Sequence, residues 1–265
     1  MKIFLAITTL AAAAFMSGCC NHPPQFLATD APEPLPVTAA QFSGKIVLDG
    51  KLDEKAWQDA AVYDLIYYDA SYEQPPRERA RVLAQKFEGG KARILYDKDY
   101  VYVATEFEDK DVMGYAPNQQ MRLHNQGDIV ELFLGPVDAM HFWEIQVAPN
   151  GKTACFYYLT TDMMPSITEL TAQTKLPRGL KSAVAIDGKL NEHKNWDKSW
   201  TSEIRIPRKM FAAAGSPFEP GKPWTLRFGR WNASHNLYSV QKSYYPEQPY
   251  CRYFQRQYFA PLVIK

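Results

Sequence analysis

The chain has 265 residues, of which 46% are hydrophobic and 14% aromatic, and its 30 Lys and Arg residues nearly balance its 29 Asp and Glu residues. The hydrophobic fraction excludes a disordered chain, and the balanced charge leaves no electrostatic footprint for a nucleic-acid backbone. We therefore expect a folded chain with no nucleic-acid partner. The abundant rings favour β-sheets and leave side chains for stacking on apolar ligand faces.

The first residues have the pattern of a bacterial lipoprotein signal. Ile3 to Phe15 is an apolar run of 13 residues, too short to span a bilayer and of the right length for a signal peptide. Small residues then precede Cys19 in the sequence Met16-Ser17-Gly18-Cys19. The pattern predicts a signal peptide over residues 1–18 and a lipid on Cys19. That lipid would anchor the chain in the bacterial cell envelope, facing the periplasm or the exterior. The alternative is a plain secretory signal.

Residues 19–41 are rich in proline, which predicts an extended tether, and residues 42–265 are expected to form a single domain. Cys155 and Cys251 fall inside that domain. They would form a disulfide in an oxidising compartment, or remain two buried thiols. Sequence alone does not choose between these alternatives, because it does not place the two residues within bonding distance.

Along the domain, Ile46 to Lys51 is expected to be a strand that runs into a turn. A short helix should follow, with Asp53 as its N-cap and with Leu52 packed on Trp57. Period-two patterns then predict further strands over residues 93–96, 100–107, 128–134, 141–147, 153–159, 183–186, 200–206 and 224–231. A second short helix is expected over residues 208–214. The stretch 237–258 fits either a last strand or a ligand-facing loop.

The strands outnumber the helices, which predicts an all-β fold: an antiparallel β-sandwich, or a flattened barrel, with one or two short peripheral helices. Six segments also occur in a particular order, namely 49–57, 95–103, 127–134, 142–151, 200–207 and 224–230. They begin with Asp-Gly-Lys-Leu-Asp-Glu-x-x-Trp, include Gly-Asp-x-Val-Glu-Leu-Phe-Leu and end with Trp-x-x-x-Phe-x-Arg. This order resembles family nine carbohydrate-binding modules and their relatives. The resemblance implies an exported, non-catalytic β-sandwich that binds polysaccharide or oligosaccharide, often beside glycoside hydrolases.

Alternation assigns faces to two neighbouring strands. Three apolar residues on each strand should face the core: Val130, Leu132 and Leu134, and then Trp143, Ile145 and Val147. Glu131, Glu144 and Gln146 should then lie on an open outer face, together with Phe133 and Phe142. Carboxylates, an amide and rings on one open face suit a sugar. The alternative is an ordinary solvated surface.

The tryptophans divide by their positions. Trp143 and Trp224 follow apolar alternation and are expected in the core. Trp231 ends its strand beside Arg230 and Asn232, which predicts a stacking ring with two hydroxyl-binding partners. Trp196, in the Asn195-Trp196-Asp197-Lys198 loop, is a second candidate ring. The resemblance places a matching arginine at the end of the same strand, although Arg230 also fits a buried ion pair.

Metal and haem sites have weaker support in the sequence. Asp109, Asp111 and Asp128 fall in loops or at strand ends, where a structural calcium ion could bind. No spacing of Cys and His residues predicts zinc. A haem protein of the same sandwich class is an alternative, and its candidate axial ligands are His141, Met140, Met113 and Met121.

An enzyme is the remaining alternative. Glu131 and Glu144 lie on adjacent predicted strands and could reach the separation that a glycosidase needs. An open sheet does not raise the pKa of a carboxylic acid by burial, however, and the sequence has no Ser/His/Asp or Cys/His motif. We therefore expect no catalytic activity.

Overall fold

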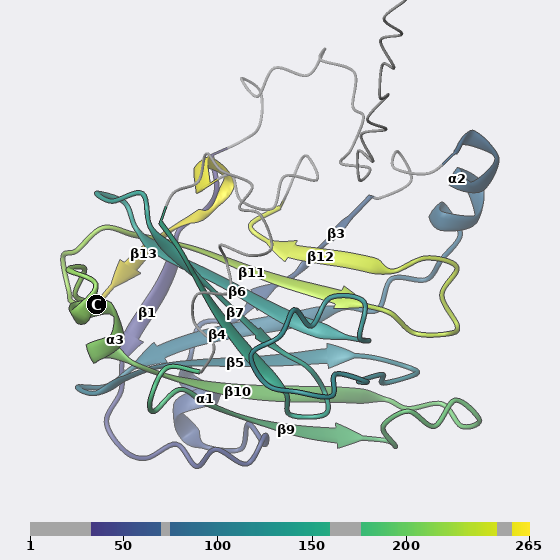
Figure 1. Ribbon diagram of the computed structural model, residues 1–265, viewed down its shortest axis with the longest axis horizontal. Coiled ribbons are helices and arrows are strands. Elements are labelled where there is room, and N and C mark those ends of the chain that lie inside the picture. The colour runs from purple at the N-terminus through teal and green to yellow at the C-terminus, as the bar shows by residue number, and fades with distance from the viewer. Residues whose placement is uncertain (1–32, 70–74, 160–175, 248–255) are drawn as a thin grey trace, which may run out of the picture. The chain divides into compact units, whose positions relative to one another are not determined.

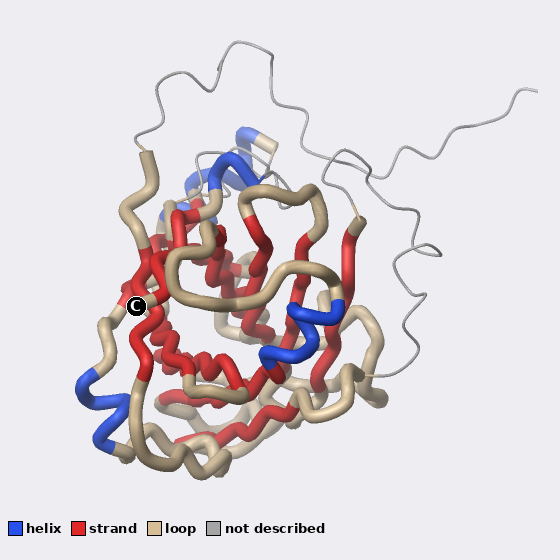
Figure 2. The backbone as a smooth tube through the Cα atoms, turned by 90° about the vertical axis from the view of Figure 1, so that its left-hand side faces the viewer, coloured by secondary structure: helices blue, strands red, loops and turns tan. Residues whose placement is uncertain are grey.

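The structure is a computed structural model in which residues 33–69, 75–159, 176–247 and 256–265 are described, all within the unit Ala31–Lys265. Its strands are β1 (Val37–Gln41), β2 (Tyr63–Asp64), β3 (Ile66–Tyr68), β4 (Gly90–Tyr96), β5 (Tyr100–Glu108), β6 (Ile129–Pro136), β7 (Phe142–Val147), β8 (Thr153–Tyr158), β9 (Lys181–Asp187), β10 (Ser199–Pro207), β11 (Trp224–Asn232), β12 (Gln241–Tyr245) and β13 (Ala260–Ile264). The described helices are α1 (Lys55–Asp59), α2 (Pro76–Leu83), α3 (Arg208–Ala213) and the short 3₁₀ turn η2 (Arg256–Tyr258). The strand-rich class is confirmed, and Figure 2 shows the short helices lying outside the strands.

Hydrogen bonds connect the strands into one mixed, nearly closed sheet with the order β8-β7-β6-β11-β13-β1-β4-β5-β10-β9. Most neighbours are antiparallel, as predicted, but β1 pairs in parallel with both β13 and β4. The expectation of a purely antiparallel sheet is therefore wrong. The cause is the position of β1, because this N-terminal strand fills the seam between a half that contains β6 and β11 and a half that contains β5 and β10 (Figure 1).

Because of β1, the folded part begins earlier in the sequence than the predicted residue 42. Val37 and Ala39 have no exposed surface and pack in the main core, although residues 19–41 were expected to be a tether. Proline-rich composition hid this strand because its own five residues, VTAAQ, carry only a short alternating pattern. Ile46, expected to begin a strand, lies outside the named strands.

The main core lies between the two halves of the sheet. The predicted inward faces of β6 and β7 are buried there, and Trp143 and Trp224 stack with their ring centroids 6.1 Å apart. Trp57 is 1% exposed, as expected, and its Nε1 donates a hydrogen bond to Glu203 Oε1 at 2.9 Å. The N-cap of α1 is Glu54, so the prediction of Asp53 at that position is wrong.

The opposite face of β6 and β7 is covered, although it was expected to be open. Phe133, Phe142 and Phe156 form a second apolar layer there with Leu123 from the β5–β6 loop and Phe259 from the C-terminal segment. Each of these five residues is at most 3% exposed. Two segments distant in sequence therefore close this face. None of the helices in the described part of the chain has the length and hydrophobicity of a membrane span.

Candidate functional site

Three loops meet at one end of the sheet, at the right-hand end of β5 and β11 in Figure 1, and we call this region the loop end. The loops follow β5, β9 and β11 and comprise residues 109–128, 188–198 and 233–240. Asp197 Oδ2 accepts a hydrogen bond from Val112 N at 2.8 Å, which joins the second loop to the first. Asp128 Oδ1 accepts one from Ala233 N at 2.6 Å, which joins the first to the third. Buried carboxylates thus fix the loops relative to one another.

Arg230 and Asp109 form an ion pair beneath the loop end. Arg230 Nη2 lies 2.9 Å from Asp109 Oδ2, and the side chains are 1% and 0% exposed. Arg230 Nη1 also donates to the carbonyl oxygens of Glu88 at 3.0 Å and Gly89 at 3.2 Å. Burial raises the pKa of Asp109, and the neighbouring guanidinium opposes that shift. The guanidinium of Arg230, predicted to bind a sugar, is therefore engaged inside the protein.

Asn232 is buried in the same network. Its Nδ2 donates to Glu88 Oε2 at 2.9 Å, and its Oδ1 accepts a hydrogen bond from Ser234 Oγ at 2.6 Å. Only 1% of Asn232 is exposed. The buried ion pair that the sequence also allowed for Arg230 is confirmed. The alternative, in which Arg230 and Asn232 offer hydroxyl-binding groups beside Trp231, is wrong, because both side chains are buried and hold the base of the loops.

The three aspartates predicted to bind calcium do not fit such a site. Asp109 faces the guanidinium of Arg230, which opposes a cation at that carboxylate. Asp128 accepts hydrogen bonds from two backbone N–H groups, including Met113 N at 2.6 Å, and burial followed by the charge of Asp109 raises its pKa well above its usual value. Asp111 has two histidine partners. Ca²⁺ takes six to eight oxygen ligands, and these carboxylates are committed to different neighbours.

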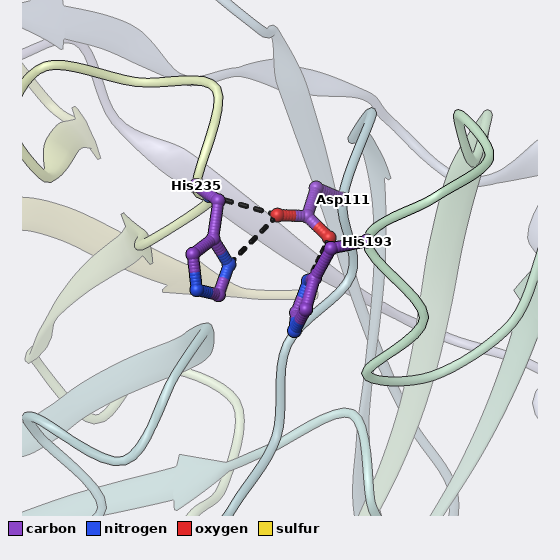
Figure 3. Close-up of side chains that lie close together, drawn as sticks. All are labelled: Asp111, His193 and His235. Atoms are coloured by element: carbon purple, nitrogen blue, oxygen red, sulfur yellow. Dashed lines mark hydrogen bonds and ion pairs between the residues drawn. The ribbon is translucent and has the colours of Figure 1, made fainter.

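Asp111 instead joins two histidines, one from each of the other loops (Figure 3). Asp111 Oδ1 lies 2.6 Å from His193 Nδ1, and Oδ2 lies 3.1 Å from His235 Nδ1. The two ring centroids are 3.9 Å apart, and Tyr115 Oη lies 2.8 Å from His193 Nε2. Burial, the largest influence, raises the pKa of Asp111, but the hydrogen bonds from His193 and His235 outweigh it and lower that pKa overall. Sequence reasoning missed this cluster because its members are 82 and 124 residues apart.

Each of the three loops carries an exposed aromatic side chain. Trp196 is 71% exposed, and Lys110 Nζ lies 5.8 Å from the centroid of its ring. Tyr115 and Tyr238 are also exposed. The backbone next to Trp196 is held firmly, because Asp197 is buried and accepts a hydrogen bond from Lys189 N at 2.7 Å. An exposed indole on an anchored loop is the geometry predicted for a stacking ring.

A cavity of about 430 Å³ lies where β4 and β10 begin and β5 ends. Its lining combines polar side chains, among them Lys91, Glu106 and Thr201, with the apolar Leu65 and Phe87. This volume is within the range of small-molecule sites. The cavity thus offers a second surface near the loop end.

Glu131, Glu144 and Gln146 lie close together, as predicted, but with His124 in a buried cluster that we call the acid–histidine cluster. His124 Nε2 is 2.5 Å from Glu131 Oε1, and Gln146 Nε2 is 3.2 Å from His124 Nδ1. Glu144 accepts hydrogen bonds from Gln146 and Tyr158. The three predicted residues are at most 2% exposed, so their expected position on an open face is wrong.

The two carboxyl groups of this cluster have opposite pKa shifts. Burial raises the pKa of both, but the charge and hydrogen bond of His124 outweigh it at Glu131 and lower that pKa overall. At Glu144, burial and the charge of Glu131 prevail and raise the pKa. Burial, the largest influence, lowers the pKa of His124, but the charge and hydrogen bond of Glu131, together with the charge of Glu144, outweigh it and raise that pKa overall. The cluster is therefore a satisfied internal network.

Trp231 is half-buried at the edge of the same network. Its Nε1 donates to Glu131 Oε2 at 3.1 Å, and its ring packs edge-on against His124 with centroids 4.7 Å apart. Lys242 Nζ lies 4.9 Å from the ring centroid. Trp231 is thus held against the acid–histidine cluster, whereas Trp196 is exposed on the loop that follows β9.

The other predicted residues are dispersed. Met140 and His141 follow one end of β6, whereas Met113 precedes the other end, and eight strand residues span roughly 25 Å. These three side chains do not converge on one iron. Met121 packs at the edge of the second apolar layer. Cys155 has a free, buried thiol, whereas Cys19 and Cys251 lie outside the described residues.

No family model matches the sequence, and no curated protein matches it. Solved structures do match its fold. A protein from Bacteroides uniformis ATCC 8492, to which carbohydrate binding has been ascribed, aligns with a TM-score of 0.63 and 14% identity over 87% of this chain and 99% of that one. A family 9 carbohydrate-binding module from Caldicellulosiruptor kristjanssonii aligns in its cellotriose complex with a TM-score of 0.52 and 16% identity, covering 87% of this chain and 93% of that one. Its glucose complex gives 0.50 and 15%, covering 86% and 95%. The chain thus has a fold like that of family 9 carbohydrate-binding modules.

Proposed function

We propose that this protein binds carbohydrate non-catalytically, and that its binding surface is the rim of the loop end. The observation that carries the proposal is Trp196, an indole that is 71% exposed at the end of a fold shared with carbohydrate-binding proteins. An exposed indole is free to stack on a ligand, and indole faces suit the C–H faces of sugars. Trp196 therefore replaces Trp231 as the favoured platform.

Polar groups beside Trp196 suit the hydroxyl groups of the same ligand. Asn195 is exposed, and its Nδ2 donates to Glu192 Oε1 at 2.8 Å, so the pair presents both donor and acceptor atoms. The side chain of Lys110 lies over the ring and provides a further donor. Stacking supplies affinity in this arrangement, and these polar groups supply selectivity.

The buried carboxyl groups support the non-catalytic part of the proposal. Glu131 and Glu144 would have to reach a sugar from within the acid–histidine cluster, where His124, Gln146 and Tyr158 already occupy their oxygens. An acid catalyst in a glycosidase must contact the glycosidic oxygen. A substrate would need to displace the covering loop before either carboxyl group could act.

We further propose that the chain is a lipoprotein of the cell envelope that supports glycan capture or degradation beside glycoside hydrolases. The support is the apolar run of residues 3–15 and the small residues that precede Cys19. Cells fed a labelled fatty acid should label the wild-type protein and not Cys19→Ser. Equal labelling of the two would refute lipidation at this residue.

The function is tested with the purified chain on an array of glycans and insoluble polysaccharides. We expect wild type to bind one glycan class and Trp196→Ala to lose at least tenfold in affinity, equivalent to about 1.4 kcal/mol. Met140→Ala, which removes an exposed side chain at the other end of β6, is the matched control and should bind like wild type. Lys91→Ala tests the 430 Å³ cavity.

The outcomes separate function from location. A folded wild-type protein that binds no glycan refutes carbohydrate binding. Binding that survives Trp196→Ala but falls in Lys91→Ala would move the site to the cavity and refute our placement of it. Loss in Trp196→Ala alone supports both the function and the location.

A further inference from the structure

We propose that Asp111, His193 and His235 form a binding site for a divalent transition metal of the zinc class. Figure 3 shows both imidazole rings presenting a nitrogen to the same carboxylate. One donor atom from each residue lies within 4.8 Å of the others. Three donors at such separations can close around one ion with small side-chain rotations. This inference does not depend on carbohydrate binding.

The type of donor selects the metal. Two imidazoles and one carboxylate form a ligand set that zinc and its neighbours in the first transition row prefer. Calcium and magnesium favour oxygen ligands, and this cluster offers only one carboxylate. Three protein ligands leave at least one tetrahedral position for water. Zn²⁺ is therefore the natural occupant, and Co²⁺ is a spectroscopic substitute.

Buried contacts hold the three ligands in position. Asp111 N donates to Asp109 Oδ1 at 2.9 Å, and Asp109 is itself fixed by Arg230. His235 N donates to Asp111 Oδ2 at 2.8 Å, which locks the third loop onto the carboxylate. The loop that carries His193 is joined to the first loop through Asn191, whose Oδ1 accepts from Gly114 N at 2.8 Å and whose Nδ2 donates to Gly114 O at 3.1 Å. Such support reduces the ordering cost of metal binding.

Exposure distinguishes this cluster from the acid–histidine cluster, which also groups one histidine with carboxylates. In the acid–histidine cluster the side chains of His124 and Glu131 are only 19% and 1% exposed. The side chains of His193 and His235 are 35% and 56% exposed, so an ion can reach them from solvent. The buried Asp111 supplies the negative charge that retains it. We therefore assign the metal site to the loop end alone.

A metal ion bound at this site would hold the three loops together. Each ligand comes from a different loop, so one ion would cross-link all three at the rim that carries Trp196. A metal that binds the folded state and not the unfolded chain raises stability as its concentration exceeds its dissociation constant. The ion is thus expected to order the loop end and to raise the unfolding temperature.

The test uses the full chain in detergent, stripped with a chelator and then titrated with Zn²⁺ by calorimetry and with Co²⁺ by visible absorption. The test variants are His193→Ala, His235→Ala and the double variant that carries both substitutions. The control is His141→Ala, which removes a histidine at the other end of β6. Cys19, Cys20 and His22 could bind metal separately. The quantity to compare is therefore the number of metal ions bound per chain, which we expect to be one higher in wild type than in the double variant.

We expect wild type and His141→Ala to bind this equivalent and each single variant to bind it at least tenfold more weakly. The Co²⁺ absorption that disappears in the double variant should contain no thiolate charge-transfer band, because none of the three proposed ligands is a cysteine. Zn²⁺ should raise the unfolding temperature of wild type and leave that of the folded double variant unchanged. An equal number of bound equivalents in wild type and the double variant, or loss of the equivalent in His141→Ala, would overturn the proposal.

Discussion

Replacing Arg230 by Met tests whether its pair with Asp109 holds the loop end together. The substitution keeps the aliphatic part of the side chain but removes the guanidinium, so the carboxyl group of Asp109 stays buried without the charge partner that lies 2.9 Å away. Removing one member of a buried pair typically costs about 3–5 kcal/mol. Two carbonyl oxygens, of Glu88 and Gly89, also lose a donor. We expect a loss of about 3–5 kcal/mol in the free energy of unfolding at pH 7.

Protonation of Asp109 limits this loss of stability and makes the loss depend on pH. Burial already raises the pKa of Asp109 in the folded protein, and loss of Arg230 should raise it further. An acid with a raised folded-state pKa favours the folded state at low pH and loses that contribution as the pH rises through the folded-state pKa. The deficit of Arg230→Met should therefore shrink as the pH falls from 7 toward 5.

Urea denaturation followed by tryptophan fluorescence measures the effect. Asp109→Asn, alone and combined with Arg230→Met, completes a double-mutant cycle, and the coupling between the two sites should exceed about 1 kcal/mol. Arg93→Met is the matched control, because Arg93 and Glu106 form a more exposed pair at 3.3 Å whose loss should cost about 0–1 kcal/mol. A deficit of Arg230→Met no larger than that of Arg93→Met, or an absence of coupling, would show that the buried pair does not hold the loop end.

Four further substitutions test other parts of the fold. Trp57→Phe leaves the buried oxygen Oε1 of Glu203 without its indole donor and should lower the free energy of unfolding by about 1.5–3 kcal/mol, whereas an unchanged midpoint in urea would count against that bond. Gly50→Ala places a Cβ 2.4 Å from Ala185 N at a φ of +84°, so we expect a loss of at least about 1 kcal/mol by the same assay, and a neutral result would contradict the close approach. Glu144→Gln and Glu131→Gln should have opposite pH profiles, measured as unfolding free energies between about pH 3 and pH 8. The raised pKa of Glu144 makes its contribution disappear as the pH rises above about 4.5, and the lowered pKa of Glu131 makes its contribution disappear as the pH falls below about 4.5; profiles of the same sign would refute the assignment.

Much of the fold follows from the sequence because alternation is a local signal. The strands from β4 to β11 occur near their expected positions, and the inward residues of β6 and β7 are correctly assigned. The outer face was misjudged for a physical reason. Alternation shows which side chains share a face, but it does not show whether water or another segment covers that face. Phe133 and Phe142 were the signal of a second apolar layer, and the segments that cover them, including Leu123 and Phe259, are fixed only by the topology.

The same limit explains the misjudged site. Glu131 and Gln146 are directly opposite in the ladder of β6 and β7, so their proximity could be inferred from adjacent strands. Their burial could not, because it depends on His124 and the loop that carries it. The cluster of Asp111, His193 and His235 is less accessible still to sequence reasoning. Its residues follow β5, β9 and β11, and only the closing of the sheet brings the ends of these strands together.

The interior of the loop end carries charged side chains, and its rim carries aromatic rings and imidazoles. Experiments on function therefore have to use substitutions at the rim. Substitution of Arg230 or Asn232 changes the support of every loop, so weaker ligand binding in such variants would not locate a site. Trp196 lies at the rim, where its truncation leaves the buried pair of Arg230 and Asp109 in place. Binding measured on rim variants of unchanged stability is therefore the observation that separates recognition from folding in this protein.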